Sequence, residues 1–229
     1  MSEQRVADPL AEAAVAEIQN GMLVGLGTGR TASRGVVALA ERVKTEDLKL
    51  RCVATSHATE TLARFHALPV MDFALVEKVD YLFDGADEVD GGMNMLKGSG
   101  GAMTRERIVA WASEKRVYMV DESKLVNRLG QRTTLPIAVL AFGLTAVRGE
   151  LRNLGLNGVC RRTIKGELFI TDNGNLIIDV ALGEHDLSEL AASLNDIPGV
   201  IDHGLFLTEA DEILIERDSG SIEHRVRQQ

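Results

Sequence analysis

The order of strand-like and helix-like patterns along the first part of the chain constrains its fold more than any other feature. Short apolar runs alternate there with longer segments whose apolar residues recur at helical spacing. Each run has the length of a buried strand and is bounded by glycine or polar residues. The predicted strands are 22–24, 48–54, 79–83 and 117–120, and the predicted helices are 5–19, 31–43, 58–67 and 104–113. This alternation predicts an α/β fold built on a parallel sheet.

The pattern changes after about residue 130. Asp172-Asn173-Gly174 lies between two apolar runs and predicts a hairpin turn. Asp186 precedes a helical pattern as a plausible N-cap. The predicted strands are 135–142, 159–163, 167–171, 176–181, 204–206 and 213–216, and the predicted helices are 145–154 and 186–194. This part therefore predicts a small α+β unit with antiparallel hairpins.

Composition limits the choice of partners. The formal net charge of -9 argues against nucleic acid, although a small phosphorylated ligand needs only a local positive site. No stretch approaches the roughly 20 apolar residues of a membrane span, and residues 1–20 do not resemble a signal peptide. We therefore expect a cytoplasmic protein without a membrane partner. Two cysteines make no disulfide framework, and Cys52 in its apolar run is expected to be a buried thiol.

A glycine-rich segment, residues 25–31 (GLGTGRT), joins the first predicted strand to the next helix. Glycines let backbone amides approach an anion closely, and a helix N-terminus favours negative charge. Thr28 and Thr31 add hydroxyl donors, and Arg30 adds a guanidinium group that suits phosphate. A tight turn without a ligand is the alternative. The segment matches neither a P-loop nor a dinucleotide fingerprint.

An acidic segment, residues 84–91 (DGADEVDG), follows the third predicted strand. Carboxylates at a strand end can hold sugar hydroxyls or transfer protons. A solvated acidic loop is the alternative. A calcium loop is disfavoured because Ala86 and Met95 stand where oxygen ligands are needed. The histidines show no ligand-pair spacing, so no metal site is predicted.

Two further segments carry lysines. In residues 97–107 (KGSGGAMTRER), Lys97 borders a flexible loop and is suited to stabilise an oxyanion. Glu106 falls in the first turn of a helix, where the helix dipole alone also favours a carboxylate. Lys124 follows the fourth strand and is either a phosphate contact or an exposed lysine. Ligands of parallel sheets bind beyond the carboxyl ends of the strands, so segments 25–31, 84–90 and 121–124 are expected to converge.

Together and in this order, these segments resemble the type A ribose-5-phosphate isomerases. The resemblance extends to residues 172–179 (DNGNLIID) and 197–206 (IPGVIDHGLF) and covers essentially the whole chain. It implies a Rossmann-like catalytic domain formed by 1–129 and 206–229, with a smaller ferredoxin-like α+β domain, 130–205, inserted. It also implies a homodimer or homotetramer that needs neither metal nor organic cofactor.

The resemblance implies interconversion of D-ribose 5-phosphate and D-ribulose 5-phosphate through an enediolate, in the non-oxidative pentose phosphate pathway. Glu106 would move the proton between C2 and C1, and Lys97 would stabilise the enediolate oxygens. Asp87 would assist ring opening or shuttle hydroxyl protons, and Asp84 would orient the sugar or its partner lysine. The substrate-binding residues that the resemblance implies are Thr28, Gly29, Arg30, Thr31, Asp84, Gly85, Ala86, Asp87, Lys97, Gly98, Ser99, Gly100 and Lys124.

Three positions depart from the family pattern. Arg30 and Ser99 stand where serine and glycine are usual, and Ala7 stands where a lysine often helps to bind phosphate. We hypothesise that Arg30 replaces the missing cation. The alternatives are an isomerase of another phosphorylated aldose, a non-catalytic sugar-phosphate sensor, and a deaminase or lactonase on a similar fold. The presence of Glu106 and Lys97 argues against a sensor.

Overall fold

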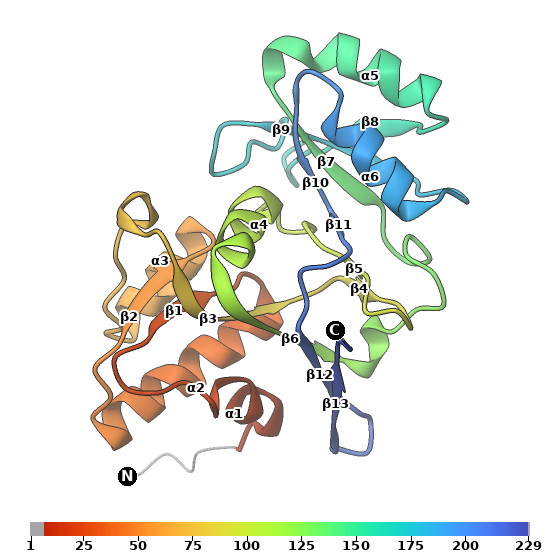
Figure 1. Ribbon diagram of the computed structural model, residues 1–229. Helices are drawn as coiled ribbons and strands as arrows, with labels where there is room; N and C mark the ends of the chain where they lie inside the picture. The colour runs from red at the N-terminus through yellow and green to blue at the C-terminus, as the bar shows by residue number, and fades with distance from the viewer. Residues whose placement is uncertain (1–6, 229) are drawn as a thin grey trace. The chain divides into compact units, whose positions relative to one another are not determined.

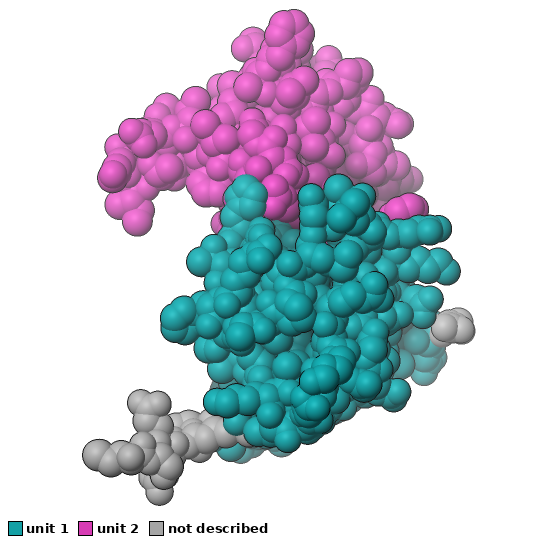
Figure 2. Space-filling view, turned by 90° about the vertical axis from the view of Figure 1, so that its left-hand side faces the viewer, with its two compact units in different colours: residues 1–85, 112–122, 211–229 teal, residues 86–111, 123–210 magenta. Residues whose placement is uncertain are grey.

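The computed structural model describes residues 7–228, and the described chain packs into two compact units (Figure 2). The first unit falls within Met1–Gly85, Ala112–Glu122 and Asp211–Gln229. The second comprises Ala86–Trp111 and Ser123–Ala210. The described part of the first unit contains one sheet and that of the second unit two, and each unit has its own apolar core.

A six-stranded sheet forms the centre of the first unit (Figure 1), and its order is β13-β12-β6-β3-β1-β2. All neighbouring strands are parallel except β12 and the edge strand β13. The strands are β1 Leu23–Leu26, β2 Arg51–Ala54, β3 Val79–Gly85, β6 Ser113–Asp121, β12 Glu212–Glu216 and β13 Ile222–Val226. The chain leaves β1 for β2 on one side and returns to β3 on the other. The carboxyl ends of β1 and β3 therefore form a topological switch point, where such sheets bind ligands.

Three α-helices accompany this sheet: α1 Pro9–Val15, α2 Arg30–Glu46 and α3 His57–Phe65. Asp8 caps α1 by accepting a bond from the Ala11 amide, and Pro9 occupies the first turn. Helix α2 packs on β3 so closely that a Cβ on Gly35 would lie 2.6 Å from the Phe83 ring. A short 3-10 turn, η1 Phe73–Leu75, precedes β3. Cys52 in β2 is fully buried, as predicted, and burial raises the pKa of its thiol to about 12.

The second unit contains a four-stranded antiparallel sheet, ordered β10-β7-β9-β8. Two helices and four strands alternate as β-α-β-β-α-β, which is the ferredoxin-like arrangement implied by the resemblance. The elements are β7 Leu135–Val139, α5 Leu144–Asn153, β8 Gly158–Cys160, β9 Leu176–Val180, α6 Leu187–Asn195 and β10 Val200–His203. Asp186 caps α6 as predicted, because its carboxylate accepts bonds from the amides of Ser188 and Glu189.

A second, three-stranded sheet lies in the same unit, and its order is β11-β5-β4. Its antiparallel strands are only two residues long: β4 Glu88–Val89, β5 Met95–Leu96 and β11 Leu205–Phe206. The remaining elements of the unit are α4 Met103–Trp111, the end of η2 Glu122–Lys124, and η3 Ala141–Gly143. Among the helices between residues 7 and 228, none combines the length and the apolar character needed to cross a membrane.

Several predicted elements differ in the structure, among them strand 48–54, which begins only at Arg51, and strand 159–163, which ends at Cys160. The predicted strand 167–171 makes only isolated bridges, Arg162 to Leu168 and Ile170 to Leu176, although the turn at Asp172–Gly174 forms. The predicted strand 135–142 ends at Val139 because the 3-10 turn η3 follows. Of the predicted helix 5–19, residues 5 and 6 lie outside the described residues. The rest is helical only over Pro9–Val15, beyond which Ile18 bonds three residues back and closes a tighter turn.

Strands β4, β5, β10 and β13 were not predicted. Two of them, β4 and β5, are too short to show an alternating pattern. The predicted small domain, 130–205, lies wholly within the second unit, which also takes in 86–111, 123–129 and 206–210. These additions follow the pairing of β5 with β11. That residues 130–205 form a domain of their own stays a prediction.

Candidate functional site

The glycine loop meets Asp84 at the switch point of the first unit. The Gly27 amide donates to the Phe83 carbonyl (2.9 Å), which continues the ladder between β1 and β3. A Cβ on Gly27 would lie 2.3 Å from Asp84 Oδ1 and 2.4 Å from its Cα. Only glycine fits at this position, because the obstruction is backbone as well as side chain.

Asp84 is fully buried at the end of β3. Its Oδ1 accepts bonds from the amides of Thr28 (3.0 Å) and Gly85 (2.7 Å). A carboxylate that accepts amide bonds is well stabilised and held in one orientation. Asp84 therefore fixes the path of the glycine loop. The structure thus brings segment 25–31 together with Asp84. Residues 86–90 and 123–124 belong to the second unit, so convergence of the full segments 25–31, 84–90 and 121–124 stays a prediction.

No side chain caps the N-terminus of α2, whose N-cap residue is Gly29 (φ 102°). Free amides at the start of a 17-residue helix favour an anion. Thr31 is half-buried in the first turn, and Arg30 is exposed beside it. Arg30 makes no hydrogen bond or ion pair with the residues that the structure describes, which leaves its guanidinium available to a ligand.

A cluster of hydroxyl groups beneath the glycine loop was missed in the sequence. Thr28 Oγ1 lies 2.7, 2.9 and 3.1 Å from the hydroxyl oxygens of Thr55, Ser56 and Thr59. Thr55 and Thr59 donate in turn to backbone carbonyls at the end of β1 (3.0 and 2.9 Å). The Thr28 hydroxyl is thus already engaged, and it can donate to a ligand only if this cluster rearranges. The signal was present, because Thr55 and Ser56 directly follow β2, a neighbour of β1.

The second unit contains a buried ion pair between Lys97 and Glu106. Lys97 Nζ lies 3.2 Å from Glu106 Oε1, and the two side chains are 3% and 5% exposed. Lys97 follows β5 and is fixed by its amide, which donates to the Gly204 carbonyl (2.9 Å). Glu106 lies in the first turn of α4. Two opposite charges so deeply buried are costly to desolvate and are typical of functional sites.

Asp87 faces the loop that follows Lys97. Its Oδ2 accepts a bond from the Ser99 amide (2.9 Å), and its own amide donates to the Leu96 carbonyl (2.8 Å). Gly98 has a φ of +96°, and a Cβ there would lie 2.9 Å from Pro136 Cγ, so the position requires glycine. Asp87 is half-buried, and Ser99 and Gly100 are exposed. Asp87 and the loop Lys97–Gly100 thus form one local structure.

Two residues of the acidic segment, Glu88 and Asp90, bind backbone amides. Glu88 is fully buried and accepts three amide bonds, from Gly130 (2.6 Å), Arg132 (2.6 Å) and Thr133 (2.7 Å). Asp90 Oδ1 accepts from the Gly92 and Asn94 amides and closes its own turn. Glu88 and Asp90 are therefore structural, so the alternative of a merely solvated acidic loop is wrong for Glu88.

Arg107, which follows Glu106 in α4, binds the backbone at strand β11. Its guanidinium pairs with Asp202 (2.7 Å) and Glu209 and donates to the carbonyls of His203 (2.7 Å) and Leu205 (2.9 Å). It also lies 4.0 Å from the centroid of the Phe206 ring, and Lys97 Nζ lies 5.6 Å from the same ring. Strand β11 borders β5, so this arginine stabilises the strand from which Lys97 emerges.

Two further predicted site residues, Ala86 and Lys124, are half-buried. Ala86 is half-buried between Gly85 and Asp87. Lys124 is half-buried at the end of η2 and forms no hydrogen bond or ion pair within residues 7–228. Across that same range, no group of three or more His, Cys, Asp and Glu side chains is arranged to hold a metal ion.

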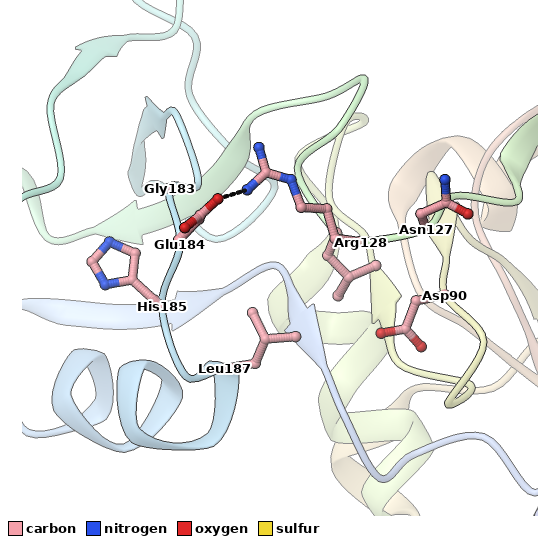
Figure 3. A pocket seen from close by; sticks show the side chains of 8 residues that line it. Asp90, Asn127, Arg128, Gly183, Glu184, His185 and Leu187 are labelled. Carbon is pink, nitrogen blue, oxygen red and sulfur yellow. Dashed lines mark ion pairs between the residues drawn. The ribbon is translucent and has the colours of Figure 1, made fainter.

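A surface hollow of about 480 Å³ lies elsewhere in the second unit (Figure 3). Its most prominent polar contact is an ion pair between Arg128 and Glu184 (3.6 Å), whose side chains are 59% and 94% exposed. Such exposed pairs contribute little energy. The hollow is lined by Asp90, Asn127, Arg128, Leu129, Gly183, Glu184, His185 and Leu187, and therefore by none of the predicted site residues.

The first unit carries a glycine loop at the switch point of a parallel sheet, and the second carries a buried lysine–glutamate pair. Each of these features is typical of an α/β enzyme, and the pair is suited to acid–base chemistry. Residues 51–220 match the family model described as ribose 5-phosphate isomerase A (phosphoriboisomerase A). The chain belongs to this family.

Individual relatives agree with this result. The chain is 46% identical to ribose-5-phosphate isomerase A of Sphingopyxis alaskensis over 214 residues, which cover 93% of this chain and 92% of the relative. Among solved structures, ribose 5-phosphate isomerase from Plasmodium falciparum matches with a TM-score of 0.92 at 34% identity, covering 96% of this chain and 97% of that one. A D-ribose-5-phosphate isomerase in complex with phospho-erythronic acid matches with a TM-score of 0.91 at 34% identity, covering 95% and 96%.

Proposed function

We propose that this chain is an aldose–ketose isomerase that interconverts D-ribose 5-phosphate and D-ribulose 5-phosphate, a step of the non-oxidative pentose phosphate pathway. Family membership supports the reaction, and a related structure carries phospho-erythronic acid, itself a phosphorylated sugar acid. The observation that carries the proposal is the buried Lys97–Glu106 pair, at 3.2 Å.

Glu106 acts as the base. It removes the proton from C2 of the open-chain aldose, the released electron pair forms the C1–C2 double bond, and the carbonyl oxygen on C1 takes up the negative charge. Return of the proton to C1 and transfer of a proton from the C2 oxygen to the C1 oxygen give the ketose. Lys97 stabilises the negative oxygen by a charge-assisted hydrogen bond. Low exposure strengthens both interactions, because little water screens them.

Asp87 transfers protons between the hydroxyl groups and assists ring opening. Its half-buried position beside the loop Gly98–Gly100 supports this role. Asp84 orients the glycine loop and the sugar, as its bonds to the Thr28 and Gly85 amides suggest.

The phosphate binds at the start of α2, through the amides of Gly29 to Thr31 and the guanidinium of Arg30. The uncapped N-terminus of α2 supports this assignment. Lys124 adds a positive contact. Thr28 shapes the glycine loop around the substrate, since its amide donates to Asp84 and its hydroxyl is engaged by its neighbours.

The decisive experiment follows ketose formation from ribose 5-phosphate in the presence of EDTA. Wild type is expected to stay active, and Glu106→Gln is expected to lose a factor of about 10³ or more in kcat with an intact fold. Glu184→Gln, which alters a side chain that is 94% exposed, is the matched control. A Glu106→Gln variant that keeps a tenth of the wild-type kcat would refute the assignment of the base. If folded wild type is inactive, other phosphorylated aldoses are screened next.

The protein is further proposed to work in the cytoplasm as a homodimer or homotetramer. The oligomeric state is measured by light scattering on the eluted protein. A monomeric mass across the working concentration range would contradict it.

A further inference from the structure

One peptide group in the loop after Lys97 is held from both of its edges. The Ser99 amide donates to Asp87 Oδ2 (2.9 Å), and the Gly98 carbonyl accepts a bond from Arg161 Nη1 (3.0 Å). Both groups belong to the peptide between Gly98 and Ser99. In a trans peptide the N–H and the C=O point in opposite directions. Asp87 and Arg161 therefore fix the orientation of the same peptide plane from opposite sides.

The loop contributes one bond of its own to this peptide, from the Gly101 amide to the Gly98 carbonyl (2.9 Å). Gly98 precedes the peptide with a φ of +96°, and Gly100 follows shortly after it with no heavy atom within 4 Å of a Cβ position. Glycine permits several backbone conformations at little cost, so a turn with a single bond of its own holds the peptide plane less firmly than the same turn with side chains bonded to it. The bonds from Arg161 and to Asp87 strengthen that hold.

Arg161 is itself held in one position. Its Nε and Nη2 pair with both carboxylate oxygens of Asp179 in β9 (2.8 and 2.5 Å). Its Nη1 also donates to the Ser99 carbonyl (2.8 Å), and its guanidinium lies 5.7 Å from the Phe169 ring centroid. The side chains of Arg161 and Asp179 are only 15% and 17% exposed. A planar guanidinium with a bidentate carboxylate partner has one preferred orientation, which lysine cannot reproduce.

We propose that Arg161, oriented by Asp179, is a positioning residue for Asp87. It holds the Gly98–Ser99 peptide so that the Ser99 N–H binds the Asp87 carboxylate in a single orientation. A charged donor on the carbonyl also polarises the peptide and strengthens the bond made by its N–H. The inference rests on the proposed function, in which Asp87 transfers protons. Arg161 acts through Asp87 and the loop.

The first test is a double-mutant cycle on kcat with Arg161→Ala and Asp87→Asn. In the wild-type background, Arg161→Ala is expected to lower kcat about 10- to 30-fold, and Asp179→Asn less. In the Asp87→Asn background, Arg161→Ala is expected to cost less than a further threefold, because the group it positions no longer transfers protons. Equal losses in both backgrounds would overturn the proposal. If the alanine variant does not fold, Arg161→Lys replaces it in the cycle, because lysine keeps the positive charge but lacks the planar guanidinium.

The second test does not depend on activity. Hydrogen exchange at the Ser99 amide is expected to speed up at least tenfold in Arg161→Ala or Arg161→Lys. Arg162→Ala is the matched control, since Arg162 bonds the Gly166 carbonyl within its own hairpin (2.5 Å). Unchanged exchange at Ser99 in the Arg161 variants would overturn the proposal that Arg161 positions Asp87. If the wild type is inactive but exchange at Ser99 is faster in the Arg161 variants, the proposed reaction is refuted. The role of Arg161 in holding the Gly98–Ser99 peptide is then still supported.

Discussion

The two units hold their predicted site residues in different ways. In the first unit, Asp84 and the glycine loop are placed by parallel strands, whose ladder continues through the Gly27 amide. In the second unit, Asp87 and Lys97 flank strands of two residues each. Strands this short have little stability of their own, so side chains from distant segments must fix them.

Three buried or half-buried side chains do so. Glu88 binds three amides between residues 130 and 133, and Arg107 binds one carbonyl before β11 and one in it. Arg161 binds the loop after Lys97. The comparison teaches that a site on a regular sheet depends on close backbone packing. A site on irregular chain depends on charged groups that satisfy backbone donors and acceptors.

Gly27→Ala is the change expected to have the largest effect, because it tests the close backbone packing of the first unit. The new Cβ would lie 2.4 Å from the Asp84 Cα, so β1 and β3 must separate at the switch point. We expect a loss of about 3 kcal/mol or more in the free energy of unfolding, measured in urea. Gly91→Ala, with open space around its Cβ, is the control. A stable Gly27→Ala protein would break the comparison.

Glu88→Ala tests the charged side chains that hold the backbone of the second unit. It leaves three buried amides without their acceptor, and we expect it to cost about 3 kcal/mol in the free energy of unfolding. Asp90→Ala should cost about 1 kcal/mol or less, because the bonds of Asp90 are more exposed. If Glu88→Ala and Asp90→Ala are equally stable, the Glu88 carboxylate does not organise residues 130–133.

Acid is expected to weaken the second unit through His203. Burial, together with the neighbouring Arg107, lowers the pKa of His203 to about 4, against 6.5 in the unfolded chain. The unfolded chain therefore binds a proton that the folded chain does not. The stability is complete above pH 6.5 and falls as the pH drops towards 4, by about 2 kcal/mol at pH 5. His203→Asn should remove this part of the pH dependence of unfolding, whereas His66→Asn should not. An unchanged pH dependence in His203→Asn would contradict the assignment.

Arg30→Ser should give the smallest effect and tests whether the first unit also relies on a side-chain charge. The guanidinium is exposed and bonds nothing within residues 7–228, so stability should not change. We expect KM for ribose 5-phosphate to rise about 5- to 10-fold with a smaller change in kcat, as for lost phosphate binding. Steady-state kinetics at low ionic strength measure this, with Arg128→Ser as control. An unchanged KM would mean that the helix amides alone hold the phosphate.

The sequence by itself determined the features that depend on near neighbours along the chain. Alternating apolar runs gave the parallel sheet and its glycine loop, and the turn at Asp172–Gly174 and the cap at Asp186 followed from local residue preferences. The separate roles of Glu106 and Lys97 came from the resemblance, because the helix dipole alone also explains a glutamate in a first helical turn. Their ion pair was not predicted and comes from the structure.

The resemblance singled out Asp84 and Asp87 among the acidic residues, but only the tertiary structure decided what holds them and what the other acidic residues bind. Residue type alone does not separate Glu88, which binds amides more than forty residues away, from Asp87, which faces the loop after Lys97. The carbonyl of Ser99 and its partner Arg161 lie 62 residues apart in sequence. Local patterns reflect the energy of residues a few positions apart. Such contacts form only once strands far apart in the chain have paired.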